Sequence, residues 1–168
     1  ARSSGVSSSC FTVVGSLRLV SGAGSSMWFA GNDQAHRSVR LFQWPDDAVD
    51  VTAWTIPVTA WNDSDYRSTG PDGNPWLSRC DDRITGAWRA GGRLGFLWSA
   101  GRGPGRPQPY IRAVTLDEQS LRVVAEPDLW SQNGAWAYPA AAPNKRGGVG
   151  LTAFFGGPTQ PAHAVGVL

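Results

Sequence analysis

The chain has 168 residues and a net charge of +2, and it contains 21 Gly, 12 Pro and 9 Trp. Charged content is low and aromatic content is high, so the chain has enough apolar surface to offset backbone ordering, which excludes a disordered protein. The 14 Arg and the single Lys form no basic run, and no window holds the ~18 uncharged apolar residues of a membrane span, so we expect neither a nucleic-acid partner nor a membrane span.

The chain opens on a polar, Ser-rich stretch, residues 1–9, which we expect to be a tail of a processed product. Beyond it, Gly or Pro interrupts nearly every window of ten residues, so no helix of ordinary length is predicted. Short runs of β-branched and aromatic residues between turn clusters predict strands instead. In chain order these runs are SMWFAG, SVRLFQW, VTAWTIPVTAW, LGFLWSAG, PYIRAVTL, LRVVAEPDLW, VGLTAFF and HAVGVL.

The chain repeats itself at two spacings. At a shift of 55 residues, 84–101 aligns without a gap on 139–156, and three glycines of each block coincide. At a shift of 70 residues, Gly22 meets Gly92 and Trp28 meets Trp98. Trp61 and Trp130 recur near the ends of two units, so both tryptophan pairs are expected to be packing positions.

A repeated four-stranded antiparallel sheet of about 50 residues is typical of a β-propeller blade. We therefore predict an all-β fold of about three blades, with units near 10–75, 76–130 and 131–168, and the alternative is a β-sandwich. Three units form an incomplete ring, because propellers use ~4–8 blades. Further blades from the same parent chain, other copies or a partner chain are expected to complete it.

The third unit carries a resemblance to a known group of proteins. The stretch AWAYPAAAPNKRGGVGLTAFFGG (135–157), with Tyr138-Pro139, Asn144 and Arg146-Gly147, resembles the blade motif of secreted bacterial propellers in the sialidase-like superfamily. This resemblance implies an extracellular or cell-surface protein. The Asp-box of that superfamily is absent, since the nearest string is Asp72-Gly73-Asn74-Pro75-Trp76, and no catalytic residue is carried over.

In a propeller, the connections from second to third strand and from blade to blade share one face, where ligands usually bind. These connections hold candidate ligand-binding residues that we expect around one opening: Asp33, His36, Arg37, Arg102 and Arg106. Guanidinium groups suit recognition of a carboxylate or phosphate. Trp76, beside a polar loop, is the candidate for stacking on a sugar ring.

Catalysis by this chain alone is not expected. The two glutamates, Glu118 and Glu126, lie away from the predicted loop face, and no motif for a nucleophile or a phosphate loop is present. The leading hypothesis is a non-catalytic extracellular module that binds a glycan or a protein through its loop face, without a cofactor. The alternatives are one part of a sialidase-like glycoside hydrolase and a structural subunit of an extracellular assembly.

Two further features remain as weaker hypotheses. Asp63, Asp65 and Asp72 cluster in one loop and are weak candidates for calcium ligands, but solvated turn positions explain them better, and no metal is predicted. Cys10 and Cys80 form either one disulfide or two free thiols.

Overall fold

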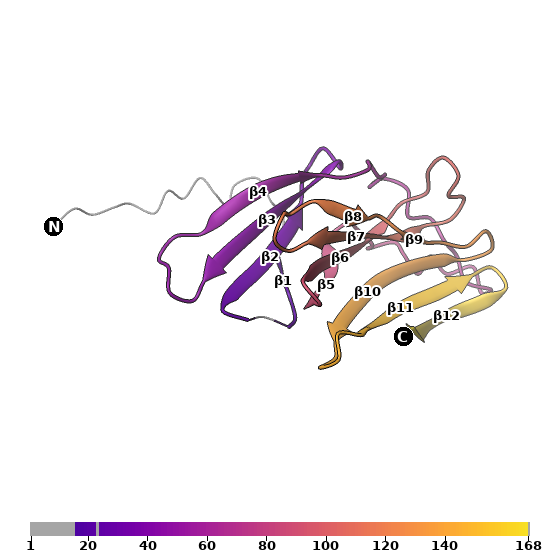
Figure 1. The fold of residues 1–168 in the computed structure, drawn as a ribbon. Coiled ribbons are helices and arrows are strands. Elements are labelled where there is room, and N and C mark those ends of the chain that lie inside the picture. Colours follow the sequence, from indigo (N-terminus) through magenta and orange to yellow (C-terminus); the bar gives the residue numbers. More distant parts are fainter. Residues whose placement is uncertain (1–15, 23, 168) are drawn as a thin grey trace.

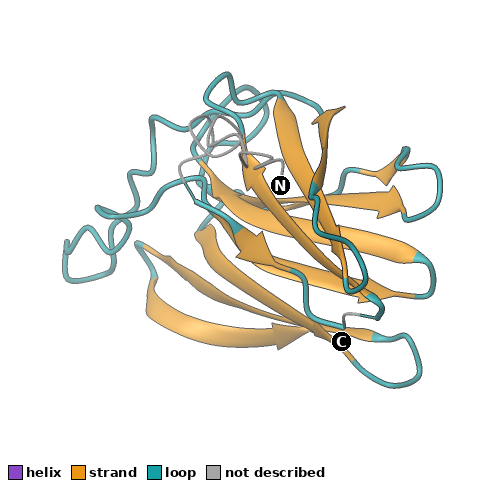
Figure 2. Cartoon of the chain, turned by 90° about the vertical axis from the view of Figure 1, so that its left-hand side faces the viewer, coloured by secondary structure: helices purple, strands orange, loops and turns teal. Residues whose placement is uncertain are grey.

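The structure is a computed structural model that describes residues 16–22 and 24–167. Its regular elements are β-strands joined by turns and loops, as Figure 2 shows, and no helix occurs among the described residues. Accordingly, that part of the chain contains no helix of the length and apolarity that crossing a membrane would require. The prediction of an all-β fold is confirmed.

The first antiparallel sheet, sheet 1, has the order β1-β2-β3-β4. Its strands are β1 (Arg18–Leu19), β2 (Ser26–Asn32), β3 (Ser38–Pro45) and β4 (Thr52–Pro57). The last three match the predicted runs SMWFAG, SVRLFQW and VTAWTIPVTAW, in which β-branched and aromatic residues favour a pleated, half-buried surface. The third run was predicted too long, because β4 ends at Pro57.

The second sheet, sheet 2, has the order β5-β6-β7-β8, and β9 also pairs with β7. Its strands are β5 (Ile84–Ala90), β6 (Arg93–Ala100), β7 (Tyr110–Asp117), β8 (Val123–Ala125) and β9 (Asp128–Leu129). The predicted run LRVVAEPDLW is therefore two short strands rather than one. Pro127 lies between them and has no N–H for the ladder, although its carbonyl accepts a hydrogen bond from Ala113 N at 3.0 Å.

The third sheet, sheet 3, has the order β10-β11-β12. Its strands are β10 (Ala135–Pro143), β11 (Val149–Gly157) and β12 (Gln160–Val167). Each of the three sheets lies within one predicted unit, and almost every strand pairs with its neighbour in the chain.

The three sheets follow one another in space as they do in the chain, with sheet 2 between the other two (Figure 1). The first strands of successive sheets lie next to each other: β1 contacts β5, and β5 contacts β10. A parallel bridge joins Ser21 to Trp88, and Thr85 Oγ1 donates a hydrogen bond to Pro139 O at 2.6 Å. The first strands of the three sheets are therefore neighbours, β10 also contacts β6 and β7, and the described residues do not close into a barrel.

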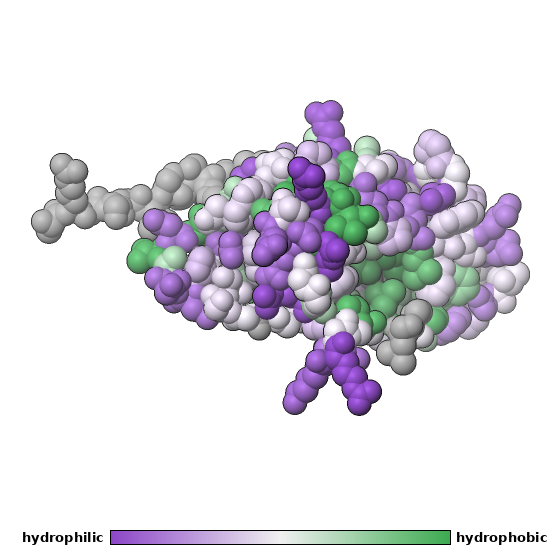
Figure 3. All heavy atoms as spheres, in the orientation of Figure 1, coloured by the Kyte–Doolittle hydropathy of each residue, from purple (hydrophilic) through white to green (hydrophobic). Residues whose placement is uncertain are grey.

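Two apolar layers join the three sheets. The larger lies between sheets 1 and 2 and includes Trp28, Leu41, Phe96, Trp98 and Leu116. The smaller lies between sheets 2 and 3 and is built around Leu97, Ile111 and Ala153. Beside this second layer the sheets leave an apolar hollow of about 360 Å³, and Figure 3 shows hydrophobic side chains gathered right of centre in this region.

The repeated glycines have a common structural role. Gly22, Gly92 and Gly147 all have positive φ angles, of 89°, 70° and 84°. Each lies in the connection between the first and second strands of its sheet, where a left-handed backbone strongly favours glycine. All three sheets therefore have a glycine with positive φ in this connection, although only Gly22 is also closely packed, because a Cβ there would lie 2.6 Å from Arg89 O.

The tryptophan pairs are only partly equivalent. Trp28 and Trp98 are both buried in the layer between sheets 1 and 2, so their packing role is confirmed. Trp28 points from sheet 1 to sheet 2, however, and Trp98 points from sheet 2 back to sheet 1, so the 70-residue alignment places them on opposite faces of their sheets. Trp61 is buried, whereas Trp130 is 44% exposed, so the prediction that both are packing positions is wrong for Trp130.

Candidate functional site

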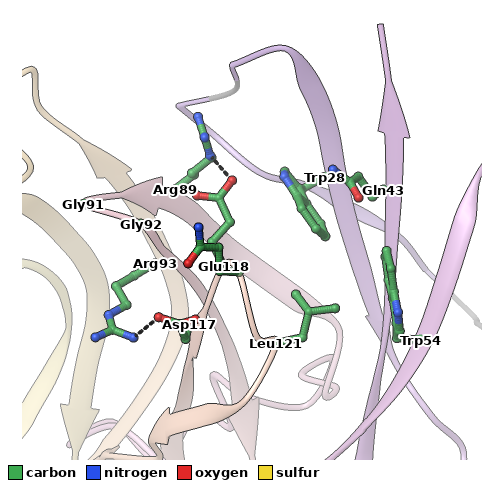
Figure 4. A pocket seen from close by; sticks show the side chains of 11 residues that line it. Trp28, Gln43, Trp54, Arg89, Gly91, Gly92, Arg93, Asp117, Glu118 and Leu121 are labelled. Carbon is green, nitrogen blue, oxygen red and sulfur yellow. Dashed lines mark hydrogen bonds and ion pairs between the residues drawn. The ribbon is translucent and has the colours of Figure 1, made fainter. Parts of the chain in front are cut away.

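A groove opens between sheets 1 and 2, and we call it the inter-sheet groove (Figure 4). Its volume is about 570 Å³, within the range of small-ligand sites. One wall comes from sheet 1 and carries Trp28, Gln43 and Trp54. The other comes from the β5–β6 and β7–β8 turns of sheet 2 and carries Arg89, Gly91, Gly92, Arg93, Asp117, Glu118, Gln119 and Leu121.

The sheet 1 wall is aromatic. Trp54 on β4 stacks on Trp28 on β2, with ring centroids 5.9 Å apart and planes inclined by 29°. Trp28 is 4% exposed and anchors the pair, whereas Trp54 is only partly buried and presents its ring to the groove. Gln43 Nε2 donates to Ser26 Oγ at 3.1 Å, which orients the amide at the edge of this wall.

The sheet 2 wall is charged, but its two positive side chains are paired with two negative ones. Arg89 Nε donates to Glu118 Oε1 at 2.7 Å, and Arg93 Nη1 donates to Asp117 Oδ2 at 2.7 Å. Glu118 N also donates to Gly92 O at 2.9 Å, which ties the two turns together. The backbone and hydroxyl of Ser120 donate to Asp117, and these bonds hold the pKa of its carboxyl below the usual value. Asp117 is therefore ionised at neutral pH and paired with Arg93.

The two walls offer complementary kinds of contact. An indole face packs against the apolar face of a flat ring, and paired carboxylate and guanidinium groups accept and donate hydrogen bonds at its edge. Because two cations face two anions, the inter-sheet groove adds no net charge. This arrangement suits a neutral ligand with many hydroxyl groups.

The inter-sheet groove lies away from the predicted loop face, since successive turns of an antiparallel sheet alternate between its two ends. Its residues come from two hairpin turns of sheet 2 and from three strands of sheet 1, which are far apart in sequence. Trp54 was one of several unassigned tryptophans in the sequence. In the sequence, the Gly91-Gly92 pair indicated only a turn and gave no sign of a binding site.

At the loop end, Asp33 holds its own connection in place. Its carboxylate accepts hydrogen bonds from Arg37 N at 3.1 Å, Ser38 N at 3.3 Å and Ser38 Oγ at 2.6 Å. The Arg37 side chain is exposed. Burial alone would raise the pKa of Asp33, but the bonds from Ser38 and Arg37 outweigh it, and the net direction is downward.

These bonds predict an acid-sensitive contribution of Asp33 to stability. Because the folded-state pKa lies below the unfolded value near 3.8, the contribution is present above that value and is lost as the pH falls below it. Asp33→Ala is expected to lower the free energy of unfolding by about 1–2 kcal/mol at neutral pH. Urea unfolding at pH 7 and at about pH 3 should show the native and variant curves converging in acid. An equal gap at both values would contradict this role.

Arg102 and Arg106, the two loop arginines, both form ion pairs within the chain. Arg102 Nε and Nη2 donate to Asp65 Oδ2 at 3.1 and 2.8 Å. Arg106 Nε and Nη2 donate to Asp128 Oδ2 at 3.1 and 2.9 Å, and the Arg106 guanidinium lies 4.7 Å from the centre of the Trp130 ring. These contacts stabilise the loops. Because both guanidinium groups are paired, they do not form the predicted pair of free cations around one opening.

His36 belongs to a cluster that sequence analysis did not find. Its Nδ1 lies 3.0 Å from Asp82 Oδ2, which also accepts a hydrogen bond from Trp61 Nε1 at 3.0 Å. Burial raises the pKa of Asp82, as does the nearby Asp63 carboxylate, while the bonds from Trp61 and His36 oppose the rise. His36 and Asp82 are 46 positions apart, so no local pattern could link them.

His36, Asp63 and Asp82 have ligand atoms within 4.8 Å of one another, the one such group in the described residues. Of the three aspartates of the calcium hypothesis, Asp63 belongs to this group, and Asp65 and Asp72 do not. Asp65 bonds Arg67 and Arg102, and Asp72 accepts from Asn74.

Tyr66 contacts this cluster without being activated by it. Its hydroxyl lies 2.6 Å from Asp63 Oδ1 and 3.2 Å from Ser99 O. Burial raises the pKa of Tyr66 far above its usual value, and the Asp63 carboxylate adds to the effect. The phenol therefore stays protonated at neutral pH and is poorly suited to act as a nucleophile.

Trp76 and Cys80 belong to the connection between β4 and β5 and are partly buried. Trp76 Nε1 donates to Ser68 Oγ at 3.1 Å, and the side chain packs against a small apolar cluster of Leu77, Ala135 and Ala137. Cys80 lies against the same small cluster, and burial raises the pKa of its thiol to about 11. Cys10 lies outside the described residues.

Comparisons of this chain with known protein families, with curated proteins and with solved structures each find no match.

Proposed function

We propose that this chain is an extracellular binding module of the β-propeller type, and that it binds a neutral glycan in the inter-sheet groove. The observation that carries the glycan proposal is the pairing of an aromatic wall, Trp54 backed by Trp28, with a charge-balanced wall, Arg89–Glu118 and Arg93–Asp117. A pyranose ring has one apolar face and a rim of hydroxyl groups, which matches these two walls.

The arrangement of the three sheets supports the propeller part of the proposal. The first strands of successive sheets are neighbours, and the one bridge between sheets 1 and 2 is parallel, as expected when one sheet is rotated about an axis beside its first strand. A glycine with positive φ in the first connection of each sheet supports the same arrangement.

Glycan-array binding tests this function. The native chain is expected to retain neutral hexose-containing glycans, and Trp54→Ala should weaken binding by about ten-fold or more, equivalent to about 1.4 kcal/mol. Glu118→Gln should also weaken binding, because it breaks the ion pair with Arg89. Trp44→Ala is the matched control, since Trp44 is exposed on the opposite face of sheet 1.

The result that would overturn the proposal is equally specific. A Trp54→Ala chain that stays folded and binds the same glycans as the native chain would exclude the inter-sheet groove. Failure of the native chain to retain any neutral glycan would exclude the glycan as ligand.

A further inference from the structure

Three side chains with metal-binding atoms meet at the loop end of the molecule, away from the inter-sheet groove. His36 lies in the connection between β2 and β3, and Asp63 and Asp82 lie near the two ends of the connection between β4 and β5. One imidazole nitrogen and one oxygen from each carboxylate all lie within 4.8 Å of one another. The fold therefore brings a nitrogen donor and two oxygen donors from two separate connections to one place.

The spacing of these atoms fits a single cation. His36 Nδ1 lies 3.0 Å from Asp82 Oδ2. Ligand atoms that are each ~2.0–2.2 Å from a zinc ion lie about 3–4 Å from one another, so small side-chain movements would place all three donors on one ion. An imidazole nitrogen combined with carboxylate oxygens suits zinc, whereas calcium and magnesium prefer oxygen ligands alone.

The two carboxylates of this cluster differ from most other acids of the chain in having no guanidinium partner. The acids that pair with an arginine are Asp65, Asp81, Asp117, Glu118 and Asp128. Among residues 16–22 and 24–167, no Lys or Arg forms an ion pair with Asp63 or Asp82. They accept hydrogen bonds from uncharged donors instead, Tyr66 Oη at 2.6 Å and Trp61 Nε1 at 3.0 Å. A divalent cation would balance the two negative charges.

Asn32, the last residue of β2, provides an independent observation. Its Oδ1 is buried and has no hydrogen-bond partner in the part of the chain that the structure describes. Its Nδ2 donates to Asp82 O at 2.5 Å, so this amide lies directly against one of the three residues of the cluster. A buried acceptor without a donor is unfavourable, and a water molecule on a bound cation would supply that donor.

The His36 backbone is fixed in a conformation that is uncommon for a residue with a side chain. Its φ is 53°, in the left-handed region. Its N–H donates to Asp33 O at 3.2 Å, and its carbonyl accepts from Trp61 N at 3.1 Å. The His36 and Asp82 side chains are 35% and 16% exposed, so the cluster is open to ions from solvent but partly shielded from it.

We propose that His36, Asp63 and Asp82 bind one zinc ion, which joins the β2–β3 connection to both ends of the β4–β5 connection. Three protein ligands leave a fourth position for water, and the buried Asn32 amide oxygen accepts a hydrogen bond from it. The ion stabilises the long β4–β5 connection against sheet 1. This site is independent of the inter-sheet groove and of the number of sheets in the whole protein.

Isothermal titration of zinc chloride into the 168-residue chain, treated with EDTA and carrying no histidine tag, tests the site. One zinc ion per chain is expected. His36→Asn removes the imidazole, and asparagine tolerates a positive φ, so the loop should keep its conformation. Asp82→Asn keeps an oxygen that can accept from Trp61 Nε1. Each variant should raise the zinc dissociation constant by about ten-fold or more.

Two control variants exclude other zinc ligands. His163→Asn removes the only other histidine, which is exposed on β12 and contacts Pro161 O. The double variant Cys10→Ser, Cys80→Ser removes both thiols of the chain. Both variants are expected to bind zinc like the native chain. Calcium chloride, titrated in the same way, should bind about ten-fold more weakly or worse.

Thermal unfolding gives a second readout. Zinc at about a hundred times its dissociation constant should raise the unfolding midpoint of the native chain by about 5 °C or more, and should leave that of His36→Asn almost unchanged. Unfolding curves in EDTA show whether each variant is folded.

Four results would each overturn the zinc site: no zinc binding by the native chain, equal binding by His36→Asn, loss of binding in either control variant, or calcium binding as tight as zinc binding. Glycan binding by the His36→Asn chain is expected to match that of the native chain, because His36 does not line the inter-sheet groove. Failure of the zinc site would therefore leave the proposed function standing, and the reverse also holds.

Discussion

Asp128→Ala is expected to lower the free energy of unfolding by about 3–5 kcal/mol, because it leaves a buried guanidinium without its carboxylate. Asp128 and Arg112 side chains are only 6% and 8% exposed, and Arg112 Nε donates to Asp128 Oδ1 at 2.9 Å. Asp128 also accepts from Arg106, so the substitution releases the 101–109 loop as well. Arg112 would keep only its bonds to the carbonyls of Thr59 and Ala60.

Urea or thermal unfolding of native and variant chains measures this loss. Asp81→Ala is the control, because Asp81 and Arg83 form an ion pair whose side chains are 42% and 61% exposed. Exposed pairs contribute about 0–1 kcal/mol, so this variant should unfold almost like the native chain. Similar effects at both positions would show that the buried pair has no special weight.

Trp98→Ala is expected to have a comparable effect, also about 3–5 kcal/mol, for a different reason. Trp98 is completely buried and packs on Trp61 with ring centroids 5.0 Å apart. Alanine would leave a cavity in the layer that joins sheets 1 and 2, and the surrounding strands can collapse into it only in part. Trp61, whose Nε1 donates a hydrogen bond to Asp82 Oδ2, would also lose its packing partner.

Trp130→Ala provides the comparison, since Trp130 is 44% exposed and contacts the Arg106 guanidinium at the surface. It is expected to change stability by about 1 kcal/mol or less. Denaturant midpoints for the two variants should therefore differ widely. Equal midpoints would mean that the layer between sheets 1 and 2 contributes little to stability.

The strands could be predicted from sequence because their signal is local. Runs such as SVRLFQW and PYIRAVTL combine β-branched and aromatic residues, and Gly or Pro bounds them closely. The turn glycines were found in the same way, because positive φ restricts Gly22, Gly92 and Gly147 wherever the turn recurs. The split of the last strand of sheet 2 at Pro127 follows from the missing N–H, a signal present in the sequence but not used.

The candidate site could not be predicted in this way, because its parts meet only through packing between sheets. Trp54 and Glu118 face each other across the inter-sheet groove from different sheets, and neither belongs to a spaced motif. Likewise, the loop arginines were recognised as anion-binding groups, but their partners Asp65 and Asp128 are brought to them by the fold. The alignment of Trp28 with Trp98 matched residues on opposite faces of their sheets, because side chains alternate along a strand and a shift by an odd number of residues reverses the face.

The pairing of strands with their chain neighbours also bears on how the protein is made. Sheet 1 is complete by Pro57 and sheet 2 by Leu129, so each can assemble from its own segment during synthesis without waiting for distant sequence. Only the docking of one finished sheet on the next requires long-range contacts. While sheet 2 is still being synthesised, the apolar face of sheet 1 has no partner sheet. Trp28, Leu41 and Trp54 on that face are then exposed to solvent or to chaperones until sheet 2 emerges from the ribosome.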